Sequence, residues 1–308
     1  MILSCGEALI DMLPRQSTEG EAAFAPYAGG AVFNTAIALG RLGVPSGFLS
    51  GVSTDLFGEV LTDTLAASKV DTSLLIRSGR PTTLAFVKLV AGQASYAFYD
   101  ENTAGRMIAP ADLPAIPASV SAMFFGGISL MVEPGGATYE ALMTREAGSG
   151  RVLMIDPNIR PSFIRDEAAY RARIARMIGL ADIVKLSDED LHWLQGAGDM
   201  AALARGVLAK GPNIVFITEG ATGAHAFTAS QAVFVPAVKV KVADTVGAGD
   251  TFNAGVLAAL HQAGALTKAG GAAATGAQLR DALSLGVRAA AVTCSRPGAN
   301  PPWAHELS

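Results

Sequence analysis

The sequence predicts an α/β protein in three layers, with a parallel sheet between two layers of helices and a small second sheet. Half of the 308 residues are hydrophobic and only 16% are charged, so the chain has enough apolar side chains to bury a sheet on both faces. Short apolar strands alternate with helices along most of the chain, which indicates parallel strands. Residues 82–99 instead show strand-like alternation, which is typical of a hairpin.

The N-terminal part begins this alternation of strands and helices. The apolar run over residues 2–10 predicts one strand that ends at Asp11, because Pro14 and the polar residues after it break the pattern. Helical spacing of apolar residues over 31–42, directly after two glycines, predicts a helix whose start leaves room for a ligand. A strand over 47–52 and a helix over 58–68 follow.

The small second sheet is predicted from two strands that lie close together in the sequence. Apolar and polar residues alternate over 84–89 and again over 96–99, and Gly92 between them predicts a turn. We expect this hairpin to combine with residues nearer the N-terminus. The small sheet would then be formed from segments near 12–28 and 82–100.

Beyond the hairpin the alternation resumes, and we expect one domain over residues 1–308. Ligands in parallel sheets of this kind bind at the carboxyl ends of the strands. The Gly- and Ala-rich segment at 269–276 predicts a mobile loop before a helix that starts near Leu279. The predicted strands cover 122–125, 152–155, 183–185 and 214–218, and predicted helices lie near Tyr139 and begin at Glu167 and Asp188.

Composition argues against several classes of partner. The net charge is -4 and the pI is near 5.6, which argues against nucleic acids and anionic membranes, since binding either would need clustered Lys and Arg. The opening MILSCGEALID has no basic residue, unlike a signal peptide, and no apolar run reaches the roughly 18 residues of a membrane span. Cys5 and Cys294 show no CxxC spacing and the four histidines no HxxxH pairing. We expect a cytoplasmic protein with small ligands.

The strongest local signal is the segment DTVGAGDTF at 244–252, which opens a predicted helix. Its small residues let backbone N–H groups approach an anion, and the helix dipole adds about half a positive charge there. The segment therefore predicts a phosphate site. The chain has neither a Walker A sequence nor GxGxxG, so the site is not of the P-loop or dinucleotide-binding type.

Asp250, at the end of the glycine run, has two interpretations. By itself it is a helix cap. Together with Asp244, on the other side of the glycine turn, it favours phosphoryl transfer, in which a carboxylate takes the proton of a nucleophile while amides hold the phosphoryl group. The second interpretation predicts that Asp250 is a catalytic base.

Two motifs resemble the ribokinase-like (PfkB) carbohydrate kinases, and the resemblance covers essentially the whole chain. The first motif is AGGAVFNTA at 28–36, with LGRLG at 39–43 and DLFG at 55–58 behind it, and the second is the segment at 244–252. The presence of both motifs in this order is specific to this family. The resemblance implies an ATP-dependent sugar kinase that uses Mg²⁺ and holds its sugar between an α/β core and a small β lid.

The same resemblance implies a role for individual residues. Asp250 is the base. The anion hole consists of the amides of Gly247, Ala248 and Gly249. Without the resemblance, Asn34 would be a helix residue bonded to its own backbone and Asp11 a turn-forming carboxylate. The sugar-binding residues are expected to be Asp11, Gly29, Gly30, Asn34, Phe98 and Arg160.

Two further segments are similar to the nucleotide site of the family. The segment ADIVKLSDED at 181–190 is similar to the NxxE segment that helps to place Mg²⁺ through water, although Ser187 and Asp190 replace Asn and Glu. Asp190 is one methylene shorter, and Glu189 is an available substitute. Lys185 would neutralise phosphate charge if it is not a solvated lysine. In the segment ITEGATGA, the residues expected beside ATP are Thr218, Gly220 and Gly223.

A monovalent cation, K⁺, is also expected from the resemblance, beside the anion hole. Asp244 and Val246 match one part of the site that the family uses. The C-terminal segment TCSRPGA at 293–299 matches the loop that supplies the rest, with Thr293 and Gly298 as candidate carbonyl donors.

Within the family, the chain is most similar to bacterial fructokinases, through DPNIRP at 156–161 and the C-terminal TCSRPGA. The alternative sugar is 2-keto-3-deoxygluconate. Asp100 and Glu101 would repel its carboxylate, whereas Arg106 and Arg160 would attract it. A non-catalytic sugar or nucleotide sensor is a second alternative, because fold alone does not fix activity. We also expect that the lid could join two copies in a homodimer.

Overall fold

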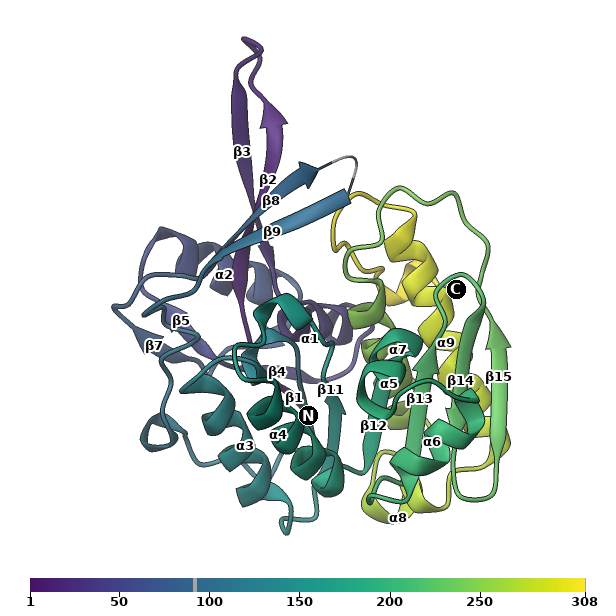
Figure 1. The fold of residues 1–308 in the computed structure, drawn as a ribbon. Helices are drawn as coiled ribbons and strands as arrows, with labels where there is room; N and C mark the ends of the chain where they lie inside the picture. Colours follow the sequence, from purple (N-terminus) through teal and green to yellow (C-terminus); the bar gives the residue numbers. More distant parts are fainter. Residues whose placement is uncertain (91–92, 308) are drawn as a thin grey trace.

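The computed structural model describes residues 1–90 and 93–307, which form three layers (Figure 1). A nine-stranded sheet is the middle layer, in the order β15-β14-β13-β12-β11-β10-β1-β4-β6. Neighbours from β6 to β13 pair in parallel, whereas β14 and β15 are antiparallel. The strands are β1 (Ile2–Cys5), β4 (Ser46–Leu49), β6 (Val70–Asp71), β10 (Ala122–Gly126), β11 (Val152–Asp156), β12 (Ile183–Ser187), β13 (Ile214–Thr218), β14 (Gly223–Phe227) and β15 (Ala232–Pro236).

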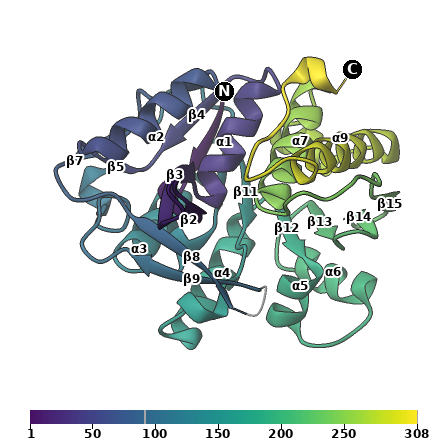
Figure 2. The same cartoon turned by 90° about the horizontal axis from the view of Figure 1, so that it is seen from above.

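Helices cover both faces of this sheet, which confirms the predicted fold class. Seen from above, α1, α2, α7 and α9 lie on one face and α3 to α6 on the other (Figure 2). The helices are α1 (Ala31–Arg41), α2 (Leu56–Ala67), α3 (Gly135–Glu146), α4 (Glu167–Leu180), α5 (Asp188–Gln195), α6 (Met200–Leu208), α7 (Ala248–Gln262), α8 (Lys268–Ala272) and α9 (Gly276–Cys294).

The hydrophobic core is divided by the sheet into two clusters. Successive residues of a strand point to opposite faces: Phe124 of β10 packs in the cluster that contains α1, α7 and α9, and Phe125 in the cluster that contains α3 and α4. Both side chains are fully buried. Strands covered on two faces therefore consist of nearly unbroken apolar residues, as in β11 and β13.

A smaller four-stranded sheet projects from one edge of the core (Figure 1). Its order is β3-β2-β8-β9, and β2 pairs with β3 in antiparallel and with β8 in parallel orientation. The turn predicted at Gly92 lies outside the described residues. The strands are β2 (Leu9–Gln16), β3 (Ala22–Gly29), β8 (Leu84–Val90) and β9 (Gln93–Tyr99), and a separate pair consists of β5 (Gly51–Ser53) and β7 (Ile76–Ser78).

The prediction of a single strand that ends at Asp11 is wrong. The chain leaves the large sheet after Cys5, and Asp11 is the third residue of β2 in the smaller sheet. Gly6 lies at this crossing, where a side chain would collide with Val32. Pro14 is accommodated within β2 because the pairing with β8 stops at Met12, so no neighbour on that side requires its missing N–H.

The prediction of a mobile loop over residues 269–276 is also wrong. Most of it belongs to the short helix α8 and to the first turn of α9. Thr267 caps α8 by accepting the N–H of Gly270, and Thr275 and Gln278 form a reciprocal capping box at α9. Alanine favours helix when such caps are present. The strand predicted over 47–52 is two strands, β4 and β5, separated at Ser50.

Candidate active site

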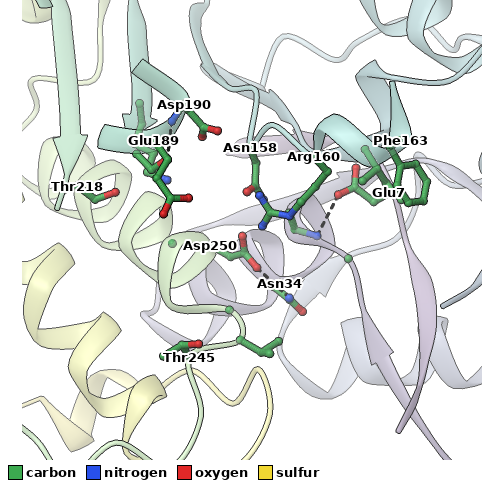
Figure 3. A pocket seen from close by; sticks show the side chains of 18 of the residues that line it. Glu7, Asn34, Asn158, Arg160, Phe163, Glu189, Asp190, Thr218, Thr245 and Asp250 are labelled. Carbon is green, nitrogen blue, oxygen red and sulfur yellow. Dashed lines mark hydrogen bonds between the residues drawn. The ribbon is translucent and has the colours of Figure 1, made fainter. Parts of the chain in front are cut away.

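A pocket of about 800 Å³ opens at the carboxyl ends of the central strands. The chain continues from β1 toward β4 on one side and from β10 toward β11 on the other, so the strand order reverses between β1 and β10. Ligand sites of open α/β sheets lie at such a reversal. Figure 3 shows Asp250 between a side with Thr218, Glu189 and Asp190 and a side with Glu7, Arg160 and Phe163.

Most of the residues predicted from the sequence line this one pocket, although they come from distant parts of the chain. Those that line it are Asp11, Gly30, Asn34, Phe98, Arg160, Lys185, Asp190, Thr218, Gly220, Val246, Gly247, Gly249 and Asp250. Six described residues of the prediction lie outside the lining, namely Gly29, Ala248, Gly223, Asp244, Thr293 and Gly298.

Asp250 lies in the first turn of α7 and is only 7% exposed. Its Oδ2 accepts a hydrogen bond from Nδ2 of Asn34 at 2.9 Å, and its carbonyl accepts one from the Thr35 hydroxyl. These bonds join the starts of α1 and α7. Burial raises the pKa of Asp250 to about 7, with a further increase from Asp156 and opposing effects from Asn34 and Lys185. A carboxyl group with this pKa can accept a proton near neutral pH.

The glycine run forms the N-terminus of α7, as an anion site requires. Gly247 is the N-cap and has a φ of 77°, which favours glycine. The N–H of Ala248 donates to the carbonyl of Thr245, and that of Thr251 to Gly247. Within the described part of the chain, the amides of Gly249 and Asp250 have no such partner. These two N–H groups are therefore the best donors for an anion.

Asp11 contributes a carboxylate from the smaller sheet. Its side chain has no hydrogen-bond partner among the described residues, and burial raises its pKa to about 6. Gly29, on the neighbouring strand, makes room for it, because a side chain at that position would collide with Oδ2 of Asp11. Gly29 thus shapes the pocket without lining it. An unpaired carboxylate beside a pocket is suited to accept hydroxyl hydrogen bonds.

An aromatic contact connects the smaller sheet to the core at the edge of the pocket. The rings of Phe98 and Phe163 meet edge to face with centroids 4.0 Å apart. Phe163 belongs to a short 3₁₀ helix (Pro161–Phe163) that follows β11. Arg160, directly before it, is exposed and its Nη1 donates to its neighbouring carbonyl of Ile159. The guanidinium group therefore has N–H donors available for a ligand.

The opposite side of the pocket carries the residues predicted to contact a nucleotide. Thr218 ends β13, and Gly220 follows it with a φ of 48°. Gly223 instead closes the turn between β13 and β14, where its carbonyl accepts the N–H of Glu219. Lys185 is not a solvated surface lysine, since it is 4% exposed and donates to Asp156 at 3.0 Å.

The acidic segment after β12 has a local explanation for its departure from NxxE. Ser187 is the N-cap of α5 and accepts the N–H of Asp190 at 3.0 Å. Asp190 is 5% exposed, and its Oδ1 accepts the N–H of Ile159. Burial, followed by the charge of Asp156, raises the pKa of Asp190.

Within the described residues, no group of three or more His, Cys, Asp or Glu side chains could hold a metal ion. An Mg²⁺ ion that arrives with a nucleotide keeps several waters and usually binds through phosphates with one or two carboxylates. Asp190 has a second carboxylate oxygen for such a water.

The two segments predicted to bind a monovalent cation are joined by Asp244. Its Oδ1 accepts the N–H of Val246 and its Oδ2 that of Gly298, both at 3.0 Å. Each oxygen keeps a further lone pair. The carbonyls of Thr293 and Gly298 each accept one N–H bond and can accept a second interaction. The donor set is entirely oxygen, which fits a hard cation.

Several pocket residues were missed by sequence reasoning. Glu7 is the most connected of them: its Oε1 accepts the N–H of Ala31, and its Oε2 that of Ser129. Burial raises its pKa. A carboxylate directly after an apolar strand was the available signal, since Glu7 follows β1 as Asp156 ends β11. The other missed residues include Leu9, Ile128, Asn158, Ser162, Phe163 and Thr245.

Comparison with protein families decides the class of reaction. The family described as pfkB family carbohydrate kinase matches residues 1–306. This chain belongs to the pfkB family. It is therefore a carbohydrate kinase, a phosphotransferase, as the two sequence motifs predicted. The chain is 59% identical to a fructokinase of Rhizobium leguminosarum bv. trifolii over 268 residues, which cover 87% of this chain and 82% of that protein.

Solved structures of two fructokinases are similar to this chain over nearly the full length. A fructokinase from Xylella fastidiosa with bound ATP superposes with a TM-score of 0.87 and 29% identity, covering 99% of this chain and 97% of that one. A fructokinase double mutant from Vibrio cholerae with fructose, ADP and potassium ion has a TM-score of 0.84 and 26% identity, covering 97% and 93%. Among the described residues of this kinase, none of the helices is both long and apolar enough to cross a membrane.

Proposed function

We propose that this kinase transfers the γ-phosphoryl group of ATP to the 6-hydroxyl of D-fructose, with Asp250 as the base. The observation that carries the proposal is the buried Asp250 carboxylate at the N-terminus of α7, bonded to Asn34. The 59% identity to a fructokinase supports fructose as the sugar.

The sugar would bind on the side of the pocket nearer the smaller sheet. Asp11 accepts hydroxyl hydrogen bonds, and the backbone at Gly30 and the amide of Asn34 offer further polar contacts. Phe98 supplies an apolar wall, and Arg160 supplies donors. A few directed polar groups beside apolar walls are typical of small-ligand sites.

The nucleotide would bind along the ends of β12 and β13. Its phosphates would lie between Thr218 and Gly220 on one side and the start of α7 on the other. The amides of Gly249 and Asp250 would stabilise charge on the transferring group, and Lys185 would neutralise part of it. Donors of this kind typically contribute about 2.7–4 kcal/mol each to transition-state stabilisation. Asp250 takes the proton that the hydroxyl loses.

Two ions complete the proposal. Mg²⁺ would be held mainly by ATP and reach Asp190 through water, with Glu189 on the same side of the pocket. When bound, it neutralises phosphate charge. K⁺ would bind at the oxygens of Asp244, Val246, Thr293 and Gly298, beside the anion site. The potassium ion in a fructokinase structure from Vibrio cholerae supports the choice of ion.

The charged residues that follow Phe98 in the sequence, Asp100, Glu101 and Arg106, do not line the described part of the pocket. Arg106, which could have attracted a carboxylate, is paired with Asp100 at 3.1 Å, and its guanidinium also donates to the carbonyl of Glu133. Arg106 is absent from the described lining of the pocket. Arg160 is left as the arginine that a sugar acid would meet.

The smaller sheet supports a homodimer as a second part of the proposal. It exposes three large aromatic side chains, Phe24, Tyr27 and Tyr99, with exposed fractions of 50%, 44% and 63%. A second copy of the sheet would cover such rings, which are enriched in protein interfaces. We also propose that the kinase acts in the cytoplasm, where ATP is available.

A substrate panel tests the sugar. ATP consumption is measured with fructose, ribose, 2-keto-3-deoxygluconate, adenosine and tagatose, and kcat/KM is expected to be highest for fructose. A higher value for the sugar acid would reject fructose. Binding of sugar and ATP without turnover would instead identify a sensor.

A further inference from the structure

Three side chains from three different elements meet below the floor of the pocket. Asp156 is the last residue of β11, Lys185 lies in β12, and Asn253 lies in α7. They are 2%, 4% and 1% exposed. Of the three, Lys185 lines the pocket. The other two are therefore placed to act on Lys185 and not on a ligand.

The carboxylate of Asp156 accepts three hydrogen bonds, one of which fixes the position of the Lys185 ammonium group. Its Oδ2 accepts from Nζ of Lys185 at 3.0 Å and from Nδ2 of Asn253 at 2.7 Å, and its Oδ1 accepts the N–H of Asn158. Asn253 thus fixes the carboxylate from the helix side. The ammonium group of Lys185 has three N–H donors, of which Asp156 takes one.

The Lys185 ammonium group lies next to the anion site. A Cβ placed on Gly249 would be 3.3 Å from Nζ, and the N–H of Gly249 is one of the two amides at the start of α7 that have no backbone partner among the described residues. The absence of a side chain at 249 therefore lets a full positive charge approach the start of α7. In this dry environment a charge acts more strongly than in water.

The charges around Lys185 keep the ammonium form. Burial alone would lower its pKa, but Asp156, Asp190 and Asp250 raise the pKa of Lys185 above its ordinary value. Asp156 is the largest of these favourable contributions. It comes from β11, whereas Asp190 comes from α5 and Asp250 from α7.

We infer that Asp156 and Asn253 are positioning residues that hold the Lys185 ammonium group beside the anion site of α7. This inference rests on the proposed role of Lys185 toward the transferred phosphoryl group. Neither residue touches the substrate. Asp156 acts by charge and geometry, and Asn253 acts by orienting Asp156.

The test is a double-mutant cycle on the full-length enzyme, with ATP and fructose as substrates. We expect Asp156→Asn to lower kcat about 10- to 100-fold and Lys185→Met to lower it at least as much. The Asp156→Asn/Lys185→Met double variant should have the kcat of Lys185→Met, because residues that act as a unit are not additive. Asn253→Ala should lower kcat about 3- to 10-fold.

The pH profile supplies a readout that a merely structural role would not change. In Asp156→Asn the ammonium group loses its nearest counter-charge, so the alkaline decline of kcat should move to lower pH than in the wild type. In the Lys185→Met background the profile should no longer respond to Asp156→Asn.

A matched control is the lysine–aspartate pair at the opposite end of β12. Asp182 is 8% exposed, and its Oδ2 accepts from Nζ of Lys268 and from the N–H of Leu153, both at 2.7 Å. Asp182→Asn should lower thermal stability while leaving kcat and its pH profile unchanged.

The outcomes separate the two levels of the proposal. If Lys185→Met leaves kcat and the KM for ATP unchanged, the role of Lys185 itself is wrong. If Lys185→Met is impaired but Asp156→Asn is not, or if the two losses multiply in the double variant, the positioning inference is wrong. The double variant removes both buried charges, so it should unfold at a higher temperature than Lys185→Met and distinguish loss of fold from loss of function.

Discussion

Asp250 and Asp11 are two carboxylates of one pocket that differ in the element that carries them and in their hydrogen bonds. Asp250 stands on a core helix, is fixed by Asn34 and lies near Lys185. Asp11 stands on the smaller sheet and has no hydrogen-bond partner among the described residues. If the proposed roles hold, the core carries the group that reacts, whereas the smaller sheet carries a group that binds the sugar. Substitutions at the two positions should therefore change different kinetic constants.

Of the substitutions that separate the two carboxylates, Asp250→Asn should change the kinetics most. The amide keeps the shape of the side chain but cannot accept the hydroxyl proton, so kcat should fall about 10²- to 10⁴-fold while the KM for fructose changes little. Steady-state kinetics with a coupled ADP assay measures both. Unchanged sugar-dependent ATP turnover would show that Asp250 is not the base.

Asp11→Asn should act mainly on binding. Hydrogen bonds to a charged acceptor are worth about 1.5–3 kcal/mol, so kcat/KM for fructose should fall about 10- to 100-fold, chiefly through KM. The KM for ATP serves as the internal control, since it should not change. A loss confined to kcat would reverse the assignment of the two carboxylates.

The pH dependence should also distinguish the two groups. Asp250 must be ionised to accept a proton, so kcat/KM should fall about tenfold per pH unit below its pKa of about 7. Below the Asp11 pKa of about 6 the slope should become steeper. The Asp11→Asn variant should keep the first slope and lose the second, which a pH–rate profile of both proteins measures.

The smallest effect concerns stability. The pKa of Asp250 is about 7 in the folded protein and near 3.8 in the unfolded chain, because burial favours the protonated carboxyl group. The contribution of Asp250 to the free energy of unfolding is therefore largest below pH 3.8 and is lost as the pH rises through about 7. Asp250→Asn, which cannot ionise, should therefore unfold a few degrees above the wild type at pH 8 and lose this advantage at pH 4. Asp63→Asn, at an exposed site on α2, is the control and should show neither change. Equal melting temperatures at pH 8 would mean that the ionised carboxylate costs no stability.

The sequence predicted the elements that depend on local pattern. The buried strands β10 to β13 and the helix start at 244–252 were recognisable because apolar runs and a glycine turn carry the signal within a few residues. Asp250, Asn34 and Lys185 were found because they lie in such motifs. The fold class follows from the same alternation of strands and helices.

The rest depends on which strands become neighbours. The bond from Lys185 to Asp156 requires that β11 and β12 pair, and the contact of Phe98 with Phe163 requires that the smaller sheet lie over the end of β11. Neither fact is encoded within a short window. Asp11 was assigned to the wrong strand for the same reason, because only Gly6, Glu7 and Ala8 separate β1 from β2, although the two strands belong to different sheets.

Glu7 links the assembly of the pocket to the folding of the whole chain. Its carboxylate accepts one N–H from a residue 24 positions later in the chain and another from a residue 122 positions later. An ordinary helix cap forms with its own helix, but this bridge exists only after β1 and β10 are side by side. Contacts between such distant segments form slowly and require the complete topology. We therefore expect refolding chains to regain helical signal before they regain kinase activity.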